Sequence, residues 1–261
     1  MMPDEKTPRE IETLPDNAQN GEQMPVEATW EEDETAATGL LRALFVLVCS
    51  GLLLWAQWRA PESFDGPISQ NWSRWVWTSV VFNFVLPLGI LHLFFGQILA
   101  HQSWLKDQKH NAWTYGWRFA DWKKHLKLSA IVWALSVPVL FYFSRDAGIR
   151  ADYATYLPPV NTPLDWTVLL FSLVIYMFVW EWFFRGWMLF GLAQGLGVMA
   201  AIAIQGAAFG LAHWGKPDIE IIGSFAGGLI LGALCWREKS FLPAFFIHAL
   251  VHVTWAIFVK I

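Results

Sequence analysis

Long apolar runs separated by short polar stretches dominate the chain after residue 36. Crossing the ~30 Å hydrocarbon core of a bilayer takes about 20 residues of α-helix, and most of the runs approach or exceed that length. The seven runs cover residues 39–58, 75–100, 126–143, 164–192, 198–213, 221–236 and 241–259. The pattern predicts an all-α polytopic membrane bundle of seven helices, or of eight if the long fourth run breaks near Arg185 and Gly186.

The first 36 residues are polar and contain several prolines. They carry eleven Asp or Glu residues against Lys6 and Arg9, and they offer too little apolar surface to offset the entropy of ordering. We therefore predict that residues 1–36 form a disordered acidic tail. Residues 37–163 then hold the N-terminal membrane helices, and residues 164–261 hold the candidate chemistry.

Residues 101–127 interleave tryptophans with six basic residues, which is typical of an amphipathic segment lying on the membrane surface. The positive-inside rule then places this segment and the N-terminal tail in the cytoplasm, with the links 59–74 and 144–163 outside. Nucleic acid also attracts basic, aromatic segments, but this one lies between two spanning runs and lacks a nucleic-acid-binding motif. The expected partners are membrane lipids and no nucleic acid.

Composition agrees with an integral multi-pass membrane protein, for which we expect a prokaryotic cell membrane. Hydrophobic residues make up 55% of the chain, charged residues 15%, and the mean hydropathy is +0.36. Cys49 and Cys235 lie in separate apolar runs and are predicted to be small core residues rather than a disulfide or metal site. No internal repeat is evident, which disfavours a transporter built from inverted repeats.

A few strongly polar side chains lie within the apolar runs of residues 164–261. Glu181 and Arg185 are four residues apart, as are His248 and His252, so each pair shares one face of a helix. His213 ends another apolar run. Ionisable groups at bilayer depth are costly and usually pair or serve function, so these five residues are the candidate site.

Three motifs carried by these residues resemble those of the CAAX prenyl protease and bacteriocin-processing (CPBP, or Abi) family of intramembrane endopeptidases. They are Glu181-x-x-x-Arg185-Gly186, Phe209-x-x-x-His213 and His248-x-x-x-His252. The similarity extends over roughly residues 164–261, which we interpret as a CPBP-like catalytic core. Two positions depart from the family pattern, because Trp180 stands where a first glutamate is usual and His252 where Asn is usual.

The resemblance implies an endopeptidase that acts on a peptide or protein substrate, lipid-modified in the CAAX case, without a cofactor. Glu181 and His213 would polarise the attacking water. His248 and His252 would donate hydrogen bonds to the oxyanion, and Arg185 would hold Glu181.

Other interpretations of the same residues remain open. Zinc could be bound by Glu181, His213, His248 and His252, with water in an open position. The absence of the first glutamate also fits a non-catalytic CPBP-like membrane binding or scaffold protein. The turn after His213 carries Lys216 and Glu220, which we expect at a solvated loop end, with substrate contact as the alternative.

Overall fold

The longest apolar run forms the centre of the bundle. In the computed structural model, which describes residues 26–60, 70–95 and 115–261, α6 (Pro163–Glu181), the π-helix η3 (Trp182–Met188) and α7 (Leu189–Leu196) follow one another without interruption. Every residue from 179 to 192 is buried. A helix that is apolar all round requires neighbours on all sides, and α1, α2, α8 and α10 pack against this one.

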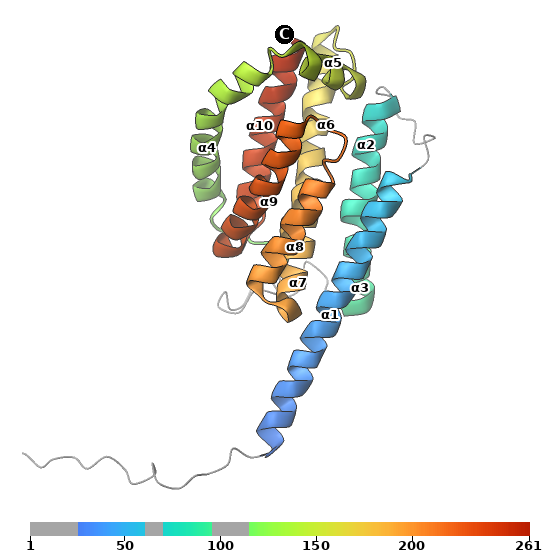
Figure 1. Cartoon of the computed structure of the whole chain (residues 1–261), viewed down its shortest axis with the longest axis vertical. Coiled ribbons are helices and arrows are strands. Elements are labelled where there is room, and N and C mark those ends of the chain that lie inside the picture. The colour runs from blue at the N-terminus through green and yellow to red at the C-terminus, as the bar shows by residue number, and fades with distance from the viewer. Residues whose placement is uncertain (1–25, 61–69, 96–114) are drawn as a thin grey trace, which may run out of the picture.

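The remaining helices surround this central run (Figure 1). They are α1 (Val26–Trp58), α2 (Gln70–Val80), the π-helix η1 (Val81–Val85), α3 (Leu86–Phe95), α4 (Trp122–Phe143), α5 (Ala147–Tyr156), α8 (Val198–Leu211), α9 (Asp218–Glu238) and α10 (Leu242–Lys260). Among the described residues, six helical segments are long and apolar enough to cross a membrane, and α8 is a shorter apolar helix. The predicted all-α membrane bundle is confirmed. In the described part of the chain the fourth apolar run does not break in two, because it passes Arg185 and Gly186 as a π-helix.

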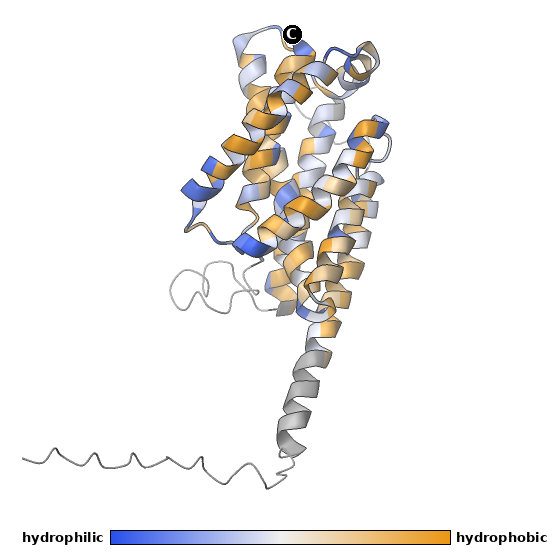
Figure 2. Cartoon of the chain, turned by 60° about the vertical axis from the view of Figure 1, so that its left-hand side comes forward, coloured by the Kyte–Doolittle hydropathy of each residue, from blue (hydrophilic) through white to orange (hydrophobic). Residues whose placement is uncertain are grey.

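The outward faces of the helices are apolar. Figure 2 shows hydrophobic residues along the helices and hydrophilic residues gathered toward their ends. Large apolar side chains such as Leu93, Leu135 and Phe171 are exposed on the bundle surface. Such extensive apolar exposure is unfavourable in water and suits contact with lipid, so the protein is a multi-pass membrane protein.

Three boundaries differ from the sequence-based expectations. Of the predicted disordered tail, residues 1–25 lie outside the described residues, whereas residues 26–36 belong to α1. Of the predicted interfacial segment, residues 101–114 also lie outside them, and Trp122–Lys127 form the start of α4. The link 144–163 contains α5, whose first turn is capped when the Asp146 side chain accepts a hydrogen bond from the backbone N–H of Ile149 at 2.9 Å.

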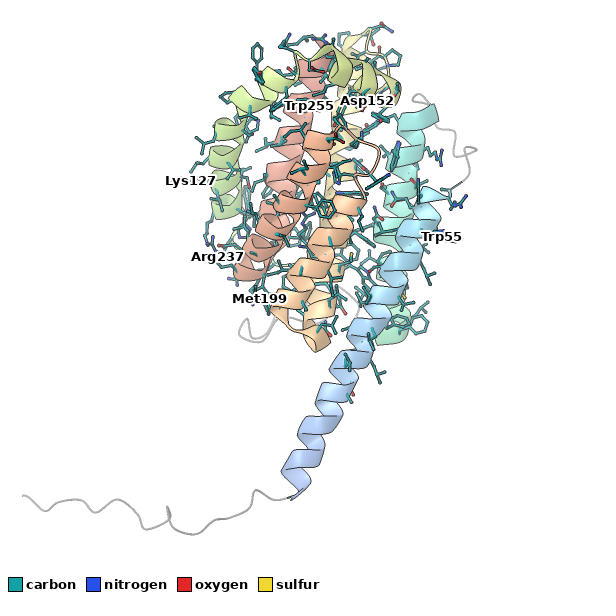
Figure 3. All side chains as sticks on the ribbon, viewed as in Figure 1. Trp55, Lys127, Asp152, Met199, Arg237 and Trp255 are labelled. Carbon is teal, nitrogen blue, oxygen red and sulfur yellow. The ribbon has the colours of Figure 1, made fainter. Side chains whose placement is uncertain are left out.

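The residues before α4 and the turn after α9 lie together at one end of the bundle. The turn after α9 packs against residues 115–124, where the Phe241 N–H donates to the Gly116 carbonyl at 3.2 Å and the Ser240 hydroxyl donates to the Arg118 carbonyl at 2.7 Å. At the opposite end lie α5 and the C-terminus, joined by a hydrogen bond from Lys260 Nζ to the Leu157 carbonyl at 3.2 Å. Figure 3 shows this separation, with Met199 and Arg237 toward the first end and Asp152 and Trp255 toward the second.

A tight turn at Gly197 brings the first two motifs to the same depth. Gly197 has φ +77°, in the region that favours glycine, and it joins α7 to α8. Glu181 lies 16 residues before Gly197 and His213 lies 16 residues after it. Because both helices rise ~1.5 Å per residue from the same turn, the two side chains reach a similar height within the bundle.

Glycines allow α8 and α9 to approach closely. A Cβ on Gly228 would lie 2.9 Å from the Cα and carbonyl oxygen of Gly206, both backbone atoms that cannot yield. Gln205 strengthens the contact by donating from Nε2 to the Gly228 carbonyl at 2.8 Å. Close packing therefore requires glycine at position 228, whereas Gly227 has no atom within 4 Å of its Cβ position.

We expect Gly228→Ala to lower the free energy of unfolding by about 1–3 kcal/mol, because the added methyl group separates two packed helices. The matched control Gly227→Ala should leave stability unchanged or raise it, since alanine is the better helix former. Thermal unfolding of both variants in detergent measures the difference. Equal midpoints would contradict the close approach of α8 and α9.

Candidate active site

A buried ionic network joins the first and third motifs. Glu181 closes α6, and Arg185 lies one turn later in η3; both side chains are fully buried. Arg185 Nη1 lies 3.0 Å from Glu181 Oε2 and donates to Oε1 at 3.2 Å. His248 of α10 donates from Nδ1 to the same Oε1 at 2.5 Å, because a carboxylate oxygen only accepts. Glu181 therefore holds both a guanidinium and an imidazole.

His213 is held by its own helix end. Its Nδ1 lies 2.7 Å from the carbonyl oxygen of Phe209, which can only accept, so Nδ1 carries the proton. In the neutral ring this leaves Nε2 unprotonated and able to accept a hydrogen bond. The motif spacing Phe209-x-x-x-His213 thus fixes a tautomer suited to accepting a hydrogen bond from water.

Two of the three histidines contact Phe209, and the third lies beside His248. The Phe209 ring centroid lies 4.7 Å from that of His213 and 5.8 Å from that of His248, and the His248 and His252 centroids are 5.8 Å apart. The Arg185 guanidinium also lies over the Phe209 ring, with Cζ 3.8 Å from its centroid. The fold therefore brings all five sequence-predicted residues into one neighbourhood.

Two cavities meet at these histidines. The first, here called the apolar cavity, has a volume of about 460 Å³ and lies among α4, α5, α9 and α10. The second, called the aromatic cavity, has about 60 Å³ and is lined by side chains such as Trp72, Tyr156 and Tyr176. The residues common to both linings are Tyr153, His213, Glu220, His248 and His252.

Glu181 lines neither cavity. This position does not agree with the sequence-based prediction that Glu181 contacts the attacking water. The carboxylate is engaged with Arg185 and His248 and has no exposed surface, so in this arrangement it positions His248.

Trp180 forms a wall of the aromatic cavity at the position where the family has its first glutamate. The indole is 4% exposed, and its ring centroid lies 5.1 Å from that of Phe184 and 6.1 Å from that of His213. The position is therefore filled by a packed indole that faces the cavity, and not by a carboxylate.

Two polar residues of the site lie in segments expected to be links. Tyr153 of α5 is buried, and its hydroxyl donates to Glu220 Oε2 at 2.7 Å. Burial raises the pKa of Tyr153 well above its ordinary value, and the nearby Glu220 carboxylate adds to the rise, so the hydroxyl stays protonated. No local pattern reveals this pairing, since α5 must first fold back over the turn after α8.

The side chain of Lys216 also packs against the protein rather than extending into solvent. Its Nζ lies 3.6 Å from the ring centroid of Tyr156 and 4.7 Å from that of Tyr153. Burial lowers the pKa of Lys216, and the charges of Glu220 and Asp152 oppose that effect. The expectation of a solvated loop end is therefore wrong for Lys216 and Glu220.

The described side chains also bear on the zinc site that the sequence left open. Throughout the part of the chain that the structure describes, no three His, Cys, Asp or Glu side chains are grouped so that they could hold a metal ion. Glu181, an expected zinc ligand, has its carboxylate paired with Arg185 and His248, which competes with coordination.

Comparison with known families agrees with this geometry. Residues 162–254 match the family described as type II CAAX prenyl endopeptidase Rce1-like. The match runs from the N-cap of α6 into α10 and contains all five predicted site residues, which confirms the resemblance seen in the three motifs. No curated protein and no solved structure matches the chain.

We expect Glu181→Gln to lower the free energy of unfolding by about 3–5 kcal/mol, because it leaves the Arg185 guanidinium buried without an anionic partner. The double substitution Glu181→Gln with Arg185→Met removes that unpaired charge and should be more stable than the single variant. Tryptophan fluorescence during thermal unfolding compares the two. A single variant as stable as the parent protein would show that Glu181 is not what neutralises Arg185.

Proposed function

We propose that the protein is a membrane-embedded endopeptidase that hydrolyses a peptide bond within or beside the bilayer. The observation that carries the proposal is the convergence of His213, His248 and His252 where an apolar and an aromatic cavity meet. This convergence lies in the region that matches type II CAAX prenyl endopeptidases. Peptide hydrolysis inside a bundle requires such a meeting of apolar volume with polar, water-accessible side chains.

In this proposal His213 activates the water. With Nδ1–H bound to the Phe209 carbonyl, Nε2 accepts a hydrogen bond from water and polarises it toward the scissile carbonyl carbon. The water oxygen forms a bond to that carbon, the carbon–nitrogen bond breaks, and the proton released by water ends on the departing amine nitrogen.

His248 and His252 stabilise the developing oxyanion in this proposal. Glu181 fixes the His248 ring through Nδ1, so Nε2 is presented in one orientation and donates to the oxyanion when the ring is protonated. Glu181 and Arg185 are then positioning residues. Oriented donors of this kind typically contribute a few kcal/mol to transition-state stabilisation.

The apolar cavity supports an apolar substrate segment. Its lining includes Val139, Phe143, Leu231 and Val251, and its volume of about 460 Å³ falls within the range of sites for drug-sized ligands. We propose that it receives apolar side chains or a lipid attached to the substrate, as the CAAX class of peptides carries.

We also propose that the end of the bundle formed by residues 115–124 and the turn after α9 faces the cytoplasm. Support comes from the basic residues concentrated there, including Arg118, Lys123, Lys124, Arg237 and Lys239. The N-terminal tail then lies on the same side, and the aromatic cavity opens nearer the opposite side.

We expect His213→Gln to lower kcat by about 100-fold or more, because glutamine cannot act as the ring nitrogen that polarises water. His92→Gln is the matched control, since His92 is exposed on α3 far from the site in sequence and lines neither cavity. Cleavage of a farnesylated CAAX peptide and of a proteome-derived peptide mixture in detergent, followed by mass spectrometry in H₂¹⁸O, measures the rates. An active parent protein whose His213→Gln variant keeps its kcat would overturn the assigned role.

A second candidate function, a non-catalytic membrane binding or scaffold protein of the same fold, is favoured by the buried indole of Trp180. It predicts that the parent protein cleaves no peptide and that Trp180→Glu creates hydrolysis, whereas Trp180→Gln does not. The endopeptidase proposal predicts cleavage by the parent and a lower unfolding temperature for Trp180→Glu, because a large buried side chain is replaced by a smaller charged one. The same peptide assay separates the two.

A further inference from the structure

Among the residues that the structure describes, Glu220 is the one acidic side chain that lines the two cavities. Glu181, the acid expected from the motifs, is turned into its ionic network, and position 180 carries an indole. A hydrolytic site that polarises water with a neutral imidazole benefits from a carboxylate that can carry the released proton. Glu220 is therefore the acid to consider.

Glu220 is held in place by a buried partner. The Tyr153 hydroxyl donates to its Oε2 at 2.7 Å, whereas its Oε1 makes no hydrogen bond to any other described residue. The side chain is half-buried and lies in the first turn of α9, where the helix dipole favours a negative charge. One carboxylate oxygen is thus anchored and the other is left for a ligand.

A structural salt bridge does not account for Glu220. Lys216, four residues earlier, lies over the rings of Tyr156 and Tyr153, and no ion pair within 4 Å joins it to Glu220 among the described residues. The lysine is held by aromatic faces, so its charge acts on the carboxylate from a distance without occupying its oxygens.

Glu220 also shares both cavities with the residue proposed to polarise water. His213 lies in the short turn between α8 and α9, Glu220 lies in the first turn of α9, and each lines the apolar and the aromatic cavity. A water molecule offers two hydrogens, which suits two acceptors on neighbouring walls.

We propose that Glu220 is a catalytic residue that acts as the general base of this site, with Tyr153 as its positioning residue. The inference rests on the proposed peptide hydrolysis. In the step assigned here, a water is held between His213 Nε2 and Glu220 Oε1, and its oxygen bonds to the scissile carbonyl carbon while one proton passes to Glu220. Glu220 then gives that proton to the amine nitrogen as the carbon–nitrogen bond breaks, and its carboxylate is regenerated.

The test measures kcat and KM for the full-length protein in detergent, with the farnesylated CAAX peptide and the proteome-derived peptide mixture as substrates. We expect Glu220→Gln to lower kcat by about 100-fold or more and to leave KM within about threefold. Asp218→Asn is the matched control, since it makes the same chemical change two residues away at an exposed position that lines neither cavity. Tyr153→Phe should lower kcat by a smaller factor of about 3- to 10-fold, because it frees the carboxylate without removing it.

Chemical rescue distinguishes a catalytic role of Glu220 from a purely structural one. Glu220→Ala should regain at least tenfold in kcat when formate is added, because the small carboxylate replaces the missing base, and Glu220→Asp should retain intermediate activity. Formate should leave the His213→Gln variant unchanged.

The outcomes distinguish this inference from the proposed function. If the parent protein is active and Glu220→Gln keeps kcat within threefold, or if Glu220→Ala is inactive and formate does not restore it, the role of Glu220 is wrong and the endopeptidase proposal stands. If the parent protein cleaves neither substrate, both are overturned. Thermal unfolding midpoints within a few degrees of the parent show that the compared variants are folded.

Discussion

The arrangement of the site depends on neutralising charge in the middle of an apolar bundle. Glu181 and Arg185 lie within a run of fourteen consecutive buried residues, from 179 to 192, where an unpaired charge would be very costly. The carboxylate meets the guanidinium on its own helix and the imidazole of His248 on α10. Because every partner is needed to offset the loss of water, the network fixes how α6, η3 and α10 are placed relative to one another.

Depth within the bundle is set by a second constraint, the short α8. After the Gly197 turn, α8 has 14 residues, fewer than the ~20 that cross a bilayer, and the turn that follows it reaches a depth similar to that of Glu181. Irregular backbone at that depth is tolerated only where protein or a cavity surrounds it. On its inner side, His213 and Lys216 of this turn line the aromatic cavity together with Glu220 of α9, whereas Trp214 is exposed on its outer side.

The surroundings of Trp180 explain why a tryptophan can stand where the family pattern has a glutamate. The indole packs against Phe184 and His213 and completes an aromatic wall, while the acidic function at the cavity is left to Glu220 on another helix. An acidic residue can be supplied from a different position in the sequence when two helices border the same water-sized space. Catalysis requires only that the carboxylate keep its position relative to the imidazole.

The sequence by itself determined the helical membrane bundle and five residues of the candidate site. Hydropathy and the four-residue spacing of Glu181 with Arg185 and of His248 with His252 are local properties, and a helix converts them directly into length and shared faces. Only the tertiary structure decided which oxygen faces which partner, that Glu181 turns away from the cavities, and that Tyr153 of α5 reaches Glu220 across 67 positions of sequence. Those contacts arise from the packing of distant helices, and no periodicity along the chain encodes the distance between two side chains on different elements.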